Sequence, residues 1–331
     1  TGKTKRERLR TLAAADTTPV EIARSLRDLC YSAWTSDPGS VKKVCAAVTV
    51  LADMHEDLEI RAIKAWIEGI AAITRADLEI AVTKLEASSK TFKRLGLEHE
   101  SARPLVAELI ALAMLGRHND AVRTGKRALR IFQKFGDELA AGKIELNLSN
   151  VVSRREKHRE AERYCRSARE RFRAIGDTEW QTLAENSLAN TYAELNDLRK
   201  AERTYTDALR NAKAAAMHVT EAEIEASLGN LELLRGNYAK ALRLFESSRT
   251  TYESLAMPHQ KAVAELEIAD TYLELNLNTE ALEIYKAVSA TLRHLKLNAE
   301  EARSRANFGR AAIRLGKFSA AKPPSVTAPG L

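Results

Sequence analysis

Helix-breaking residues are scarce in this sequence, which has 14 glycines and 7 prolines among 331 residues. Aromatic residues make up only 5% of the chain, and the runs of Val, Ile, Thr and aromatics that mark β-strands are missing. Alanine, leucine, glutamate, arginine and lysine dominate, and these residues lose least on entering a helix. The sequence therefore predicts an all-α protein that is too long for one ordinary compact core.

Cysteine and long apolar runs are also lacking. Cys30, Cys45 and Cys165 show no paired spacing, so a disulfide framework is excluded and a reducing compartment is indicated. No apolar run approaches the roughly 20 residues that a membrane span needs, and no signal-peptide pattern opens the chain. We expect a cytoplasmic protein with no membrane partner.

Charge of both signs is plentiful, with 52 basic and 45 acidic residues and a net charge of +7. This mild basic excess suits an acidic partner but is weak evidence for nucleic acid. A basic cluster opens the chain (Lys3, Lys5, Arg6, Arg8 and Arg10) and is interpreted as a solvated helix or tail.

A repeat with a step of forty residues organises the chain. Its anchor is a column of alanines at 81, 121, 161, 201, 241, 281 and 321, which Val41 extends backwards. Four residues after the anchor stand Cys45, Leu85, Gly125, Cys165, Tyr205, Phe245 and Tyr285. Twelve before it stand mostly small residues, including Gly69, Ser149, Ala189, Gly229, Ala269 and Gly309. The small columns allow two helices to approach closely, and the aromatic and leucine columns fill the space between hairpins.

Each repeat is predicted to contain a helix A, a tight turn, a helix B and a second turn. Helices A are expected near 19–34, 59–74, 99–115, 139–155, 179–195, 219–235, 259–275 and 299–315. Helices B are expected near 40–54, 78–95, 118–135, 158–175, 198–215, 238–255 and 278–296, with a further short basic helix at 3–14. Gly96, Gly136 and Gly176 are placed to end helices at positive φ.

Helix starts are marked as well. Asp137 and Asp177 follow two of these glycines and can serve at the next helix start. Capping boxes are predicted at Thr18–Glu21, with Pro19 at the first helical position, and at Thr220–Glu223.

The segment EASLGNLELLRGNYAKALRLFESS (225–248) resembles a tetratricopeptide repeat. The likeness lies in the small–Asn pair of helix A, the Gly-Asn-Tyr turn, the anchor alanine and the aromatic four residues later. It covers residues 19 to about 321, with a step longer than the family's usual thirty-four. Similar long repeats occur in kinesin light chains, bacterial peptide-sensing regulators and the arms that precede caspase-like CHAT domains. The resemblance implies a right-handed α-solenoid of about seven to eight hairpins, with helices A lining a concave groove.

A groove-facing column eleven residues before the anchor holds Cys30, Ile70, Ile110, Asn150, Asn190, Asn230, Asp270 and Arg310. An asparagine side chain carries both a donor and an acceptor, so a ladder of asparagines can bind the main chain of an extended peptide. Similar asparagines have this role in the peptide-binding members of the family. The predicted peptide-binding residues are Asn150, Asn190, Asn230, Asp270, Asn186, Lys143, Arg303 and Arg310. The alternative is that the asparagines fill small polar positions between neighbouring helices A.

The beginning of the predicted groove is apolar, with Trp66, Ile70, Val106 and Ile110. Such a surface suits either a hydrophobic anchor of a ligand or a segment of the same protein that covers it. The groove lacks an aromatic stacking platform, which argues against nucleic acid as the partner. The sequence leaves self-association open.

Catalytic and metal-binding constellations are missing, so we expect no enzyme activity, no metal and no cofactor. The seven histidines fall largely at turns and helix starts without a His-x-x-x-His pair. Cys30 has no histidine at a suitable spacing to act as a nucleophile. A second column repeats at forty residues and is interpreted as salt bridges to adjacent helices, because its carboxylates lie too far apart to act on one bond (Glu145, Glu185, Glu225 and Glu265).

Three regions follow from these patterns: a basic segment at 1–18, the repeats at 19–316 and a Pro-rich tail or linker at 317–331. Pro323 and Pro324 forbid the helix B that the register predicts there, so we expect the chain to be part of a longer protein. The leading interpretation is a non-catalytic scaffold that binds peptides or proteins. The alternative is the sensor arm of a larger effector, either a CHAT-type protease or a transcription regulator, whose active domain lies elsewhere.

Overall fold

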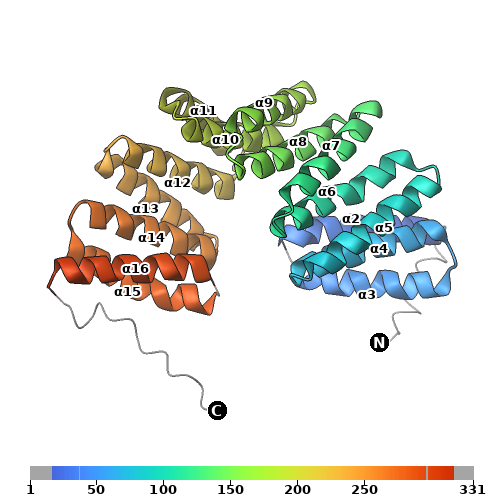
Figure 1. Ribbon diagram of the computed structural model, residues 1–331, viewed down its shortest axis with the longest axis horizontal. Coiled ribbons are helices and arrows are strands. Elements are labelled where there is room, and N and C mark those ends of the chain that lie inside the picture. Colours follow the sequence, from blue (N-terminus) through green and yellow to red (C-terminus); the bar gives the residue numbers. More distant parts are fainter. Residues whose placement is uncertain (1–16, 37, 296, 317–331) are drawn as a thin grey trace, which may run out of the picture. The chain divides into compact units, whose positions relative to one another are not determined.

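The computed structural model describes residues 17–36, 38–295 and 297–316, and these residues form fifteen helices and no strand. The predicted all-α class and the succession of helices A and B are therefore confirmed (Figure 1). The expected helix at 3–14 and the Pro-rich tail at 317–331 lie outside these described residues.

The chain divides into an N-terminal unit, Thr1–Asp177, and a C-terminal unit, Thr178–Leu331. The N-terminal unit contains α2 (Pro19–Ser36), α3 (Pro38–Met54), α4 (Leu58–Thr74), α5 (Leu78–Arg94), α6 (Glu98–Met114), α7 (His118–Lys134), α8 (Glu138–Ser153) and α9 (His158–Ala174). The C-terminal unit contains α10 (Thr178–Glu194), α11 (Leu198–Ala214), α12 (His218–Leu234), α13 (Tyr238–Ser254), α14 (Pro258–Glu274), α15 (Asn278–His294) and α16 (Asn298–Arg314). Even-numbered helices are the predicted helices A, and odd-numbered ones are the helices B.

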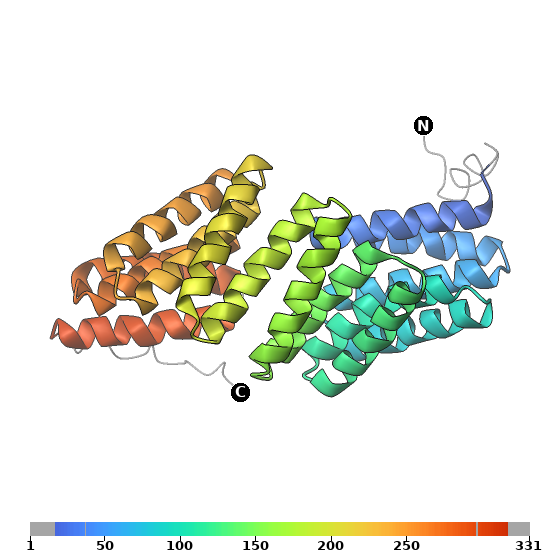
Figure 2. The ribbon, with the colours of Figure 1, turned by 90° about the horizontal axis from the view of Figure 1, so that it is seen from above.

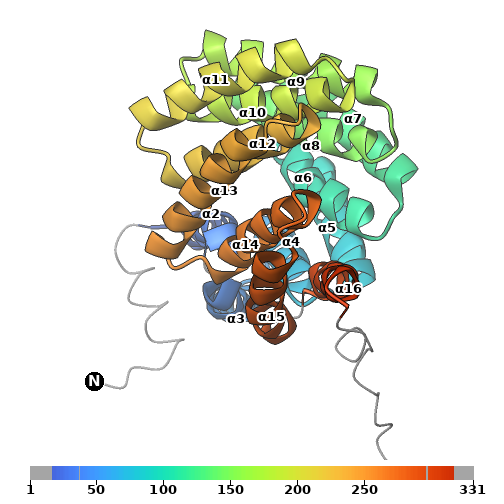
Figure 3. The ribbon, with the colours of Figure 1, turned by 90° about the vertical axis from the view of Figure 1, so that its left-hand side faces the viewer.

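Within each unit, consecutive helices pack against one another as a stack of antiparallel hairpins. Figure 2 shows the stack of α2 to α6 in the N-terminal unit, and Figure 3 shows α13 to α16 succeeding one another in the C-terminal unit. Helices A also contact the next helix A directly, as α2 does α4, α6 does α8, and α14 does α16. Each unit thus presents a surface built from helices A.

From the end of α4 onwards, the described turns share one geometry that satisfies the last carbonyls of the preceding helix. After α6, Arg117 N–H donates to the carbonyl of Leu112 at 2.9 Å, and Gly116 N–H donates to that of Ala113 at 3.1 Å. Gly116 has φ of 74°, and the predicted Gly96, Gly136 and Gly176 have φ of 75°, 67° and 72°. The same conformation recurs every twenty residues even without glycine, at Ala76, Glu156, Asn196, Ala216, Ala256 and Asn276.

Two of the three cap predictions that the structure tests are confirmed. Glu21 N–H donates to Thr18 Oγ1 at 3.2 Å, and Thr18 N–H donates back to Glu21 Oε2 at 2.7 Å, which is a capping box. Asp137 caps α8 by accepting from Ala140 N–H at 3.0 Å. The capping box predicted at Thr220–Glu223 is wrong, because α12 already begins at His218 and Thr220 is buried inside its first turn.

The repeated small and aromatic columns form the core. The anchor alanines at 81, 121, 161, 201, 241 and 281 are fully buried. Phe245 is also fully buried and packs against Gly229, where an added Cβ would lie 2.6 Å from the ring. Gly69 makes the same close approach to Leu85 at 2.5 Å. The prediction that small residues permit close helix packing is confirmed at these positions.

Candidate functional site

The predicted polar row of the C-terminal unit lies on three successive helices A. Asn190 of α10 and Asn230 of α12 are exposed, and Asp270 of α14 is half-buried. The register is the same in each helix, because each of the three residues follows a buried small residue at the matching step (Ala189, Gly229 and Ala269). The accessible amides can therefore contact a ligand on the surface of the helices A.

Tyrosine hydroxyls beneath the row hold two of its members. Tyr205 of α11 donates a hydrogen bond to Asn190 Oδ1, and Tyr285 of α15 donates to Asp270 Oδ1. Burial raises the pKa of both tyrosines, so their hydroxyls stay protonated donors at neutral pH. With Oδ1 engaged, the exposed Asn190 side chain keeps its two N–H donors for other partners.

Asparagines 150 and 230 lack such support because their B-helix counterparts are Cys165 and Phe245, which have no hydroxyl. Asn150 is exposed near the end of α8, in the N-terminal unit. No residue in the described part of the chain hydrogen-bonds to the side chain of Asn150 or Asn230. Both amides are therefore open to an acceptor and a donor of a ligand.

Asp270 is the most constrained member of the row. Its Oδ1 accepts from Asn307 Nδ2 at 2.8 Å, and its Oδ2 lies 3.5 Å from Arg303 Nε. Arg303 also pairs with Glu267 at 2.7 Å. The structure thus brings Asp270 and Arg303 together, and the arginine offsets the charge of two carboxylates.

The remaining predicted residues are dispersed. Asn186 lies one turn before Asn190 on α10, and its buried Oδ1 has no hydrogen-bond partner among the described residues. Arg310 is exposed on α16. Lys143 lies on α8 in the N-terminal unit, where it lines a cavity. The structure therefore places Asn186, Asn190, Asn230, Asp270, Arg303 and Arg310 in one unit, and Asn150 and Lys143 in the other.

The sequence prediction is wrong about the first two members of the groove column. Cys30 and Ile70 are 0% and 1% exposed and do not line the cavity described below, so they belong to the core. The reason is that α2 packs directly against α4, which covers the apolar face that the sequence assigned to the groove.

The predicted salt bridges to adjacent helices are confirmed for Glu145 and Glu225 but not for Glu185 or for Glu265, which pairs with Lys261 of its own helix. Glu145 of α8 lies 3.0 Å from Arg171 of α9, and Glu225 of α12 lies 3.6 Å from Lys213 of α11. Glu185 instead accepts from two amides, Gln181 at 2.9 Å and Asn211 at 3.0 Å. In the described residues, no three His, Cys, Asp or Glu side chains gather as a metal site would require. None of the helices described combines the length and apolar character that a membrane span needs.

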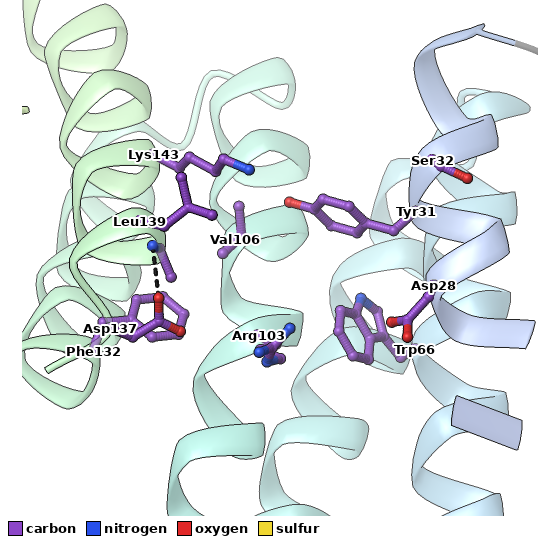
Figure 4. A pocket seen from close by; sticks show the side chains of 11 residues that line it. Asp28, Tyr31, Ser32, Trp66, Arg103, Val106, Phe132, Asp137, Leu139 and Lys143 are labelled. Atoms are coloured by element: carbon purple, nitrogen blue, oxygen red, sulfur yellow. Dashed lines mark hydrogen bonds between the residues drawn. The ribbon is translucent and has the colours of Figure 1, made fainter. Parts of the chain in front are cut away.

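A cavity of about 320 Å³ opens on the helices A of the N-terminal unit (Figure 4). Its walls come from α2, α4, α6 and α8, with Phe132 from α7. Tyr31, Trp66, Val106, Phe132, Leu139 and Ala140 supply the apolar surface, and Asp28, Arg103, Asp137 and Lys143 supply charge. The sequence had identified Trp66 and Val106 as part of an apolar segment but had missed Tyr31 and Phe132, because repeat columns do not show which neighbours converge.

Sequence comparison identifies part of the chain. Residues 141–214 match the tetratricopeptide repeat family. No curated protein sequence matches the chain.

Solved structures share the fold at low identity. A STAND ATPase with a tetratricopeptide repeat sensor from Pyrococcus horikoshii aligns with a TM-score of 0.66 and 16% identity, and covers 97% of this chain. The present chain spans 51% of that protein. The quorum sensor NprR from B. thuringiensis, in complex with its cognate peptide NprX, aligns with a TM-score of 0.60 and 16% identity, covering 91% of this chain and 86% of that one.

A third solved structure also shares the fold at low sequence identity. A Rap protein complexed with Competence and Sporulation Factor aligns with a TM-score of 0.52 and 13% identity, covering 90% of this chain and 99% of that one. The helical hairpins, the step of forty residues and the family match over residues 141–214 agree, and the described chain has the fold of a tetratricopeptide-repeat solenoid.

Proposed function

We propose that the chain is a non-catalytic scaffold that binds an extended peptide or protein segment along its helices A. The observation that carries the proposal is the support of Asn190 by Tyr205, which orients an exposed amide outward. A buried hydroxyl that fixes a surface side chain reduces the entropy lost on binding. The peptide complexes of NprR and of a Rap protein, which have the same fold, support a peptide as the ligand class.

The exposed side-chain amides of Asn190 and Asn230, here called the amide row, suit recognition of a peptide main chain. Packed helices lie about 8–10 Å apart, and an extended chain advances about 3.3 Å per residue. Helices α10 and α12 contact each other directly, so the step from Asn190 to Asn230 matches about three peptide residues. Asparagine amides can donate to and accept from main-chain groups at this spacing without reading the side chains of the ligand.

The test uses a phage-displayed library of unstructured peptides selected on the wild-type chain. We expect the double variant Asn190→Ala/Asn230→Ala to bind the selected peptides about 5- to 100-fold more weakly, because each lost hydrogen bond contributes about 0.5–1.5 kcal/mol. The loss should be similar for peptides of unrelated sequence, since the main chain is common to all of them. Asn119→Ala removes an exposed amide from a helix B and should leave the affinities unchanged.

Support by the tyrosine is tested separately. Tyr205→Phe keeps the ring but removes the donor to Asn190, and we expect a smaller, two- to tenfold loss of peptide affinity. Selected peptides that bind the double asparagine variant as tightly as wild type would refute the amide row as the binding surface.

A sensor arm of a larger effector is the second candidate. It is favoured by the STAND ATPase, a longer protein whose tetratricopeptide repeats are described as its sensor. In the complete gene, an adjoining domain with a Cys/His pair would indicate a CHAT-type protease, and a helix-turn-helix domain would indicate a transcription regulator. An open reading frame that encodes only the repeats would contradict this candidate.

A further inference from the structure

Two buried N–H donors face the cavity of the N-terminal unit without an acceptor. Trp66 is 2% exposed, and its indole Nε1 makes no hydrogen bond within the described residues. Arg103 Nε is likewise out of solvent and unbonded among those residues, although it lies 3.4 Å from Glu100. Figure 4 shows the Trp66 nitrogen on the ring edge toward Tyr31, with Arg103 beside it. Buried donors of this kind are costly, and a ligand oxygen would satisfy them.

The acidic residues of the cavity are already engaged. Asp28 pairs with Arg27 at 2.8 Å. Asp137 caps α8 through Ala140 N–H and contacts His99 Nε2 at 2.9 Å. Neither carboxylate, and no other group among the described residues, accepts a hydrogen bond from Trp66 Nε1 or Arg103 Nε.

The rest of the cavity suits one apolar group. Trp66, Phe132 and Val106 are 2%, 1% and 8% exposed. The surrounding core fixes these side chains, which together form a rigid wall of the cavity. Tyr31 forms the adjoining wall, and its ring meets that of Trp66 edge to face with the centroids 6.3 Å apart. A volume of about 320 Å³ is at the lower end for small-ligand sites and accommodates a single large amino-acid side chain.

We propose that this cavity binds an apolar side chain, aromatic or branched, whose adjoining carbonyl or carboxylate oxygen accepts hydrogen bonds from Trp66 and Arg103. The oxygen can come from two sources, an internal peptide carbonyl or a free terminal carboxylate. The site lies in the N-terminal unit and does not depend on the amide row of α10 and α12.

The probes are N-acetyl-phenylalanine, which carries a carboxylate, and N-acetyl-phenylalaninamide, which carries only carbonyl oxygens. N-acetyl-glycine has the same polar groups but no apolar side chain. We expect binding of at least one phenylalanine probe in the millimolar range or tighter, and none of N-acetyl-glycine. With ¹⁵N-tryptophan labelling, the Trp66 indole N–H resonance should shift on binding, because its N–H gains an acceptor.

Matched variants separate this site from the fold. Trp66→Phe removes the donor and keeps an aromatic wall, and it should weaken the phenylalanine probes about three- to tenfold. Trp180→Phe makes the same change in α10 of the C-terminal unit, which contributes no residue to the cavity lining, and should leave the affinity unaltered. Arg103→Gln distinguishes the two sources of the oxygen. If the site recognises a terminal carboxylate, this variant should weaken N-acetyl-phenylalanine more than N-acetyl-phenylalaninamide. If the site recognises a peptide carbonyl, it should weaken both probes equally.

Three results would overturn the proposal. The first is the absence of binding by both phenylalanine probes. The second is binding that leaves the Trp66 indole resonance unmoved. The third is equal affinity in the wild type, Trp66→Phe and Trp180→Phe.

Discussion

The close approach of Gly229 to Phe245 gives a prediction whose sign can be worked out. A Cβ at position 229 would lie 2.6 Å from Phe245 Cε1 and 2.9 Å from both Cδ1 and Cζ. Carbon atoms pack best at about 3.5–4.0 Å, and the ring is fully buried and has no solvent side toward which to move. Gly229→Ala therefore forces helices α12 and α13 apart.

The magnitude follows from two opposing effects. Overpacking a core costs about 1–3 kcal/mol, whereas alanine is favoured over glycine inside a helix by up to about 1 kcal/mol. Because contacts of 2.6–2.9 Å place this change at the severe end of overpacking, we expect a net loss of about 2 kcal/mol, which for a unit of this size lowers the melting temperature by roughly 4–8 °C.

The control is Gly309→Ala, at the same register of the repeat in α16. No atom among the described residues lies within 4 Å of a Cβ added there. Only the higher helix propensity of alanine over glycine then acts. The free energy of unfolding of this variant should rise by about 0.5–1 kcal/mol, and its melting temperature by roughly 2 °C. Calorimetric melting of both variants, with hydrogen exchange in α12 and α13, measures the effect. Equal or higher stability of Gly229→Ala would refute the packing argument.

Two further predictions concern ionisable groups. Burial raises the pKa of Glu108, whose Oε2 has no hydrogen-bond partner in the described structure. The folded state therefore holds the proton of Glu108 more tightly than the unfolded chain does. The protein loses stability as the pH rises from about 4.5 through the folded pKa of this group. Glu108→Gln should therefore stabilise the protein at pH 7, and this gain in stability should vanish toward pH 4.5. The control Glu185→Gln disrupts a carboxylate held by two amides and should not stabilise the protein. Urea titrations across pH measure both variants, and an equal gain for Glu108→Gln at pH 7 and pH 4.5 would contradict the reasoning. Burial, with a contribution from Cys45, raises the pKa of Cys30 to about 12, and burial also raises the pKa of the more accessible Cys45. In the folded chain at pH 8 we expect Cys30 to resist alkylation and Cys45 to react faster than Cys30, as followed by mass spectrometry. Modification of Cys30 before unfolding, at a rate equal to that of Cys45, would contradict this burial.

The repeat could be predicted from the sequence because its physical causes are local and recur. A buried alanine at 241, a glycine at 229 and an aromatic at 245 each restrict how two helices meet, and the same types return forty residues later. The glycine turns and the Thr18 capping box were predictable for the same reason. The left-handed conformation of six further turns was not predictable in this way. Residues such as Ala216 and Ala256, each with φ of 52°, carry no sequence mark of that conformation.

The surface of the helices A was harder to predict. Periodicity assigns Cys30 and Ile70 to one face of a helix but does not reveal that the neighbouring helix covers it. The support of Asn190 also escaped notice, although a signal exists: Tyr205 occupies a buried column in which Phe245 serves equally well. A tyrosine in such a column needs a partner for its hydroxyl. That partner lies fifteen residues earlier.

The left-handed turn that recurs every twenty residues has a consequence for how such a chain can grow. The connection from helix A to helix B and the connection from helix B to helix A use the same backbone geometry, as Gly116 and Gly136 illustrate. Any window of forty residues is therefore a complete module, whichever helix it starts with. Duplication, deletion or transplantation of such a window would create seams of a kind that the protein already contains.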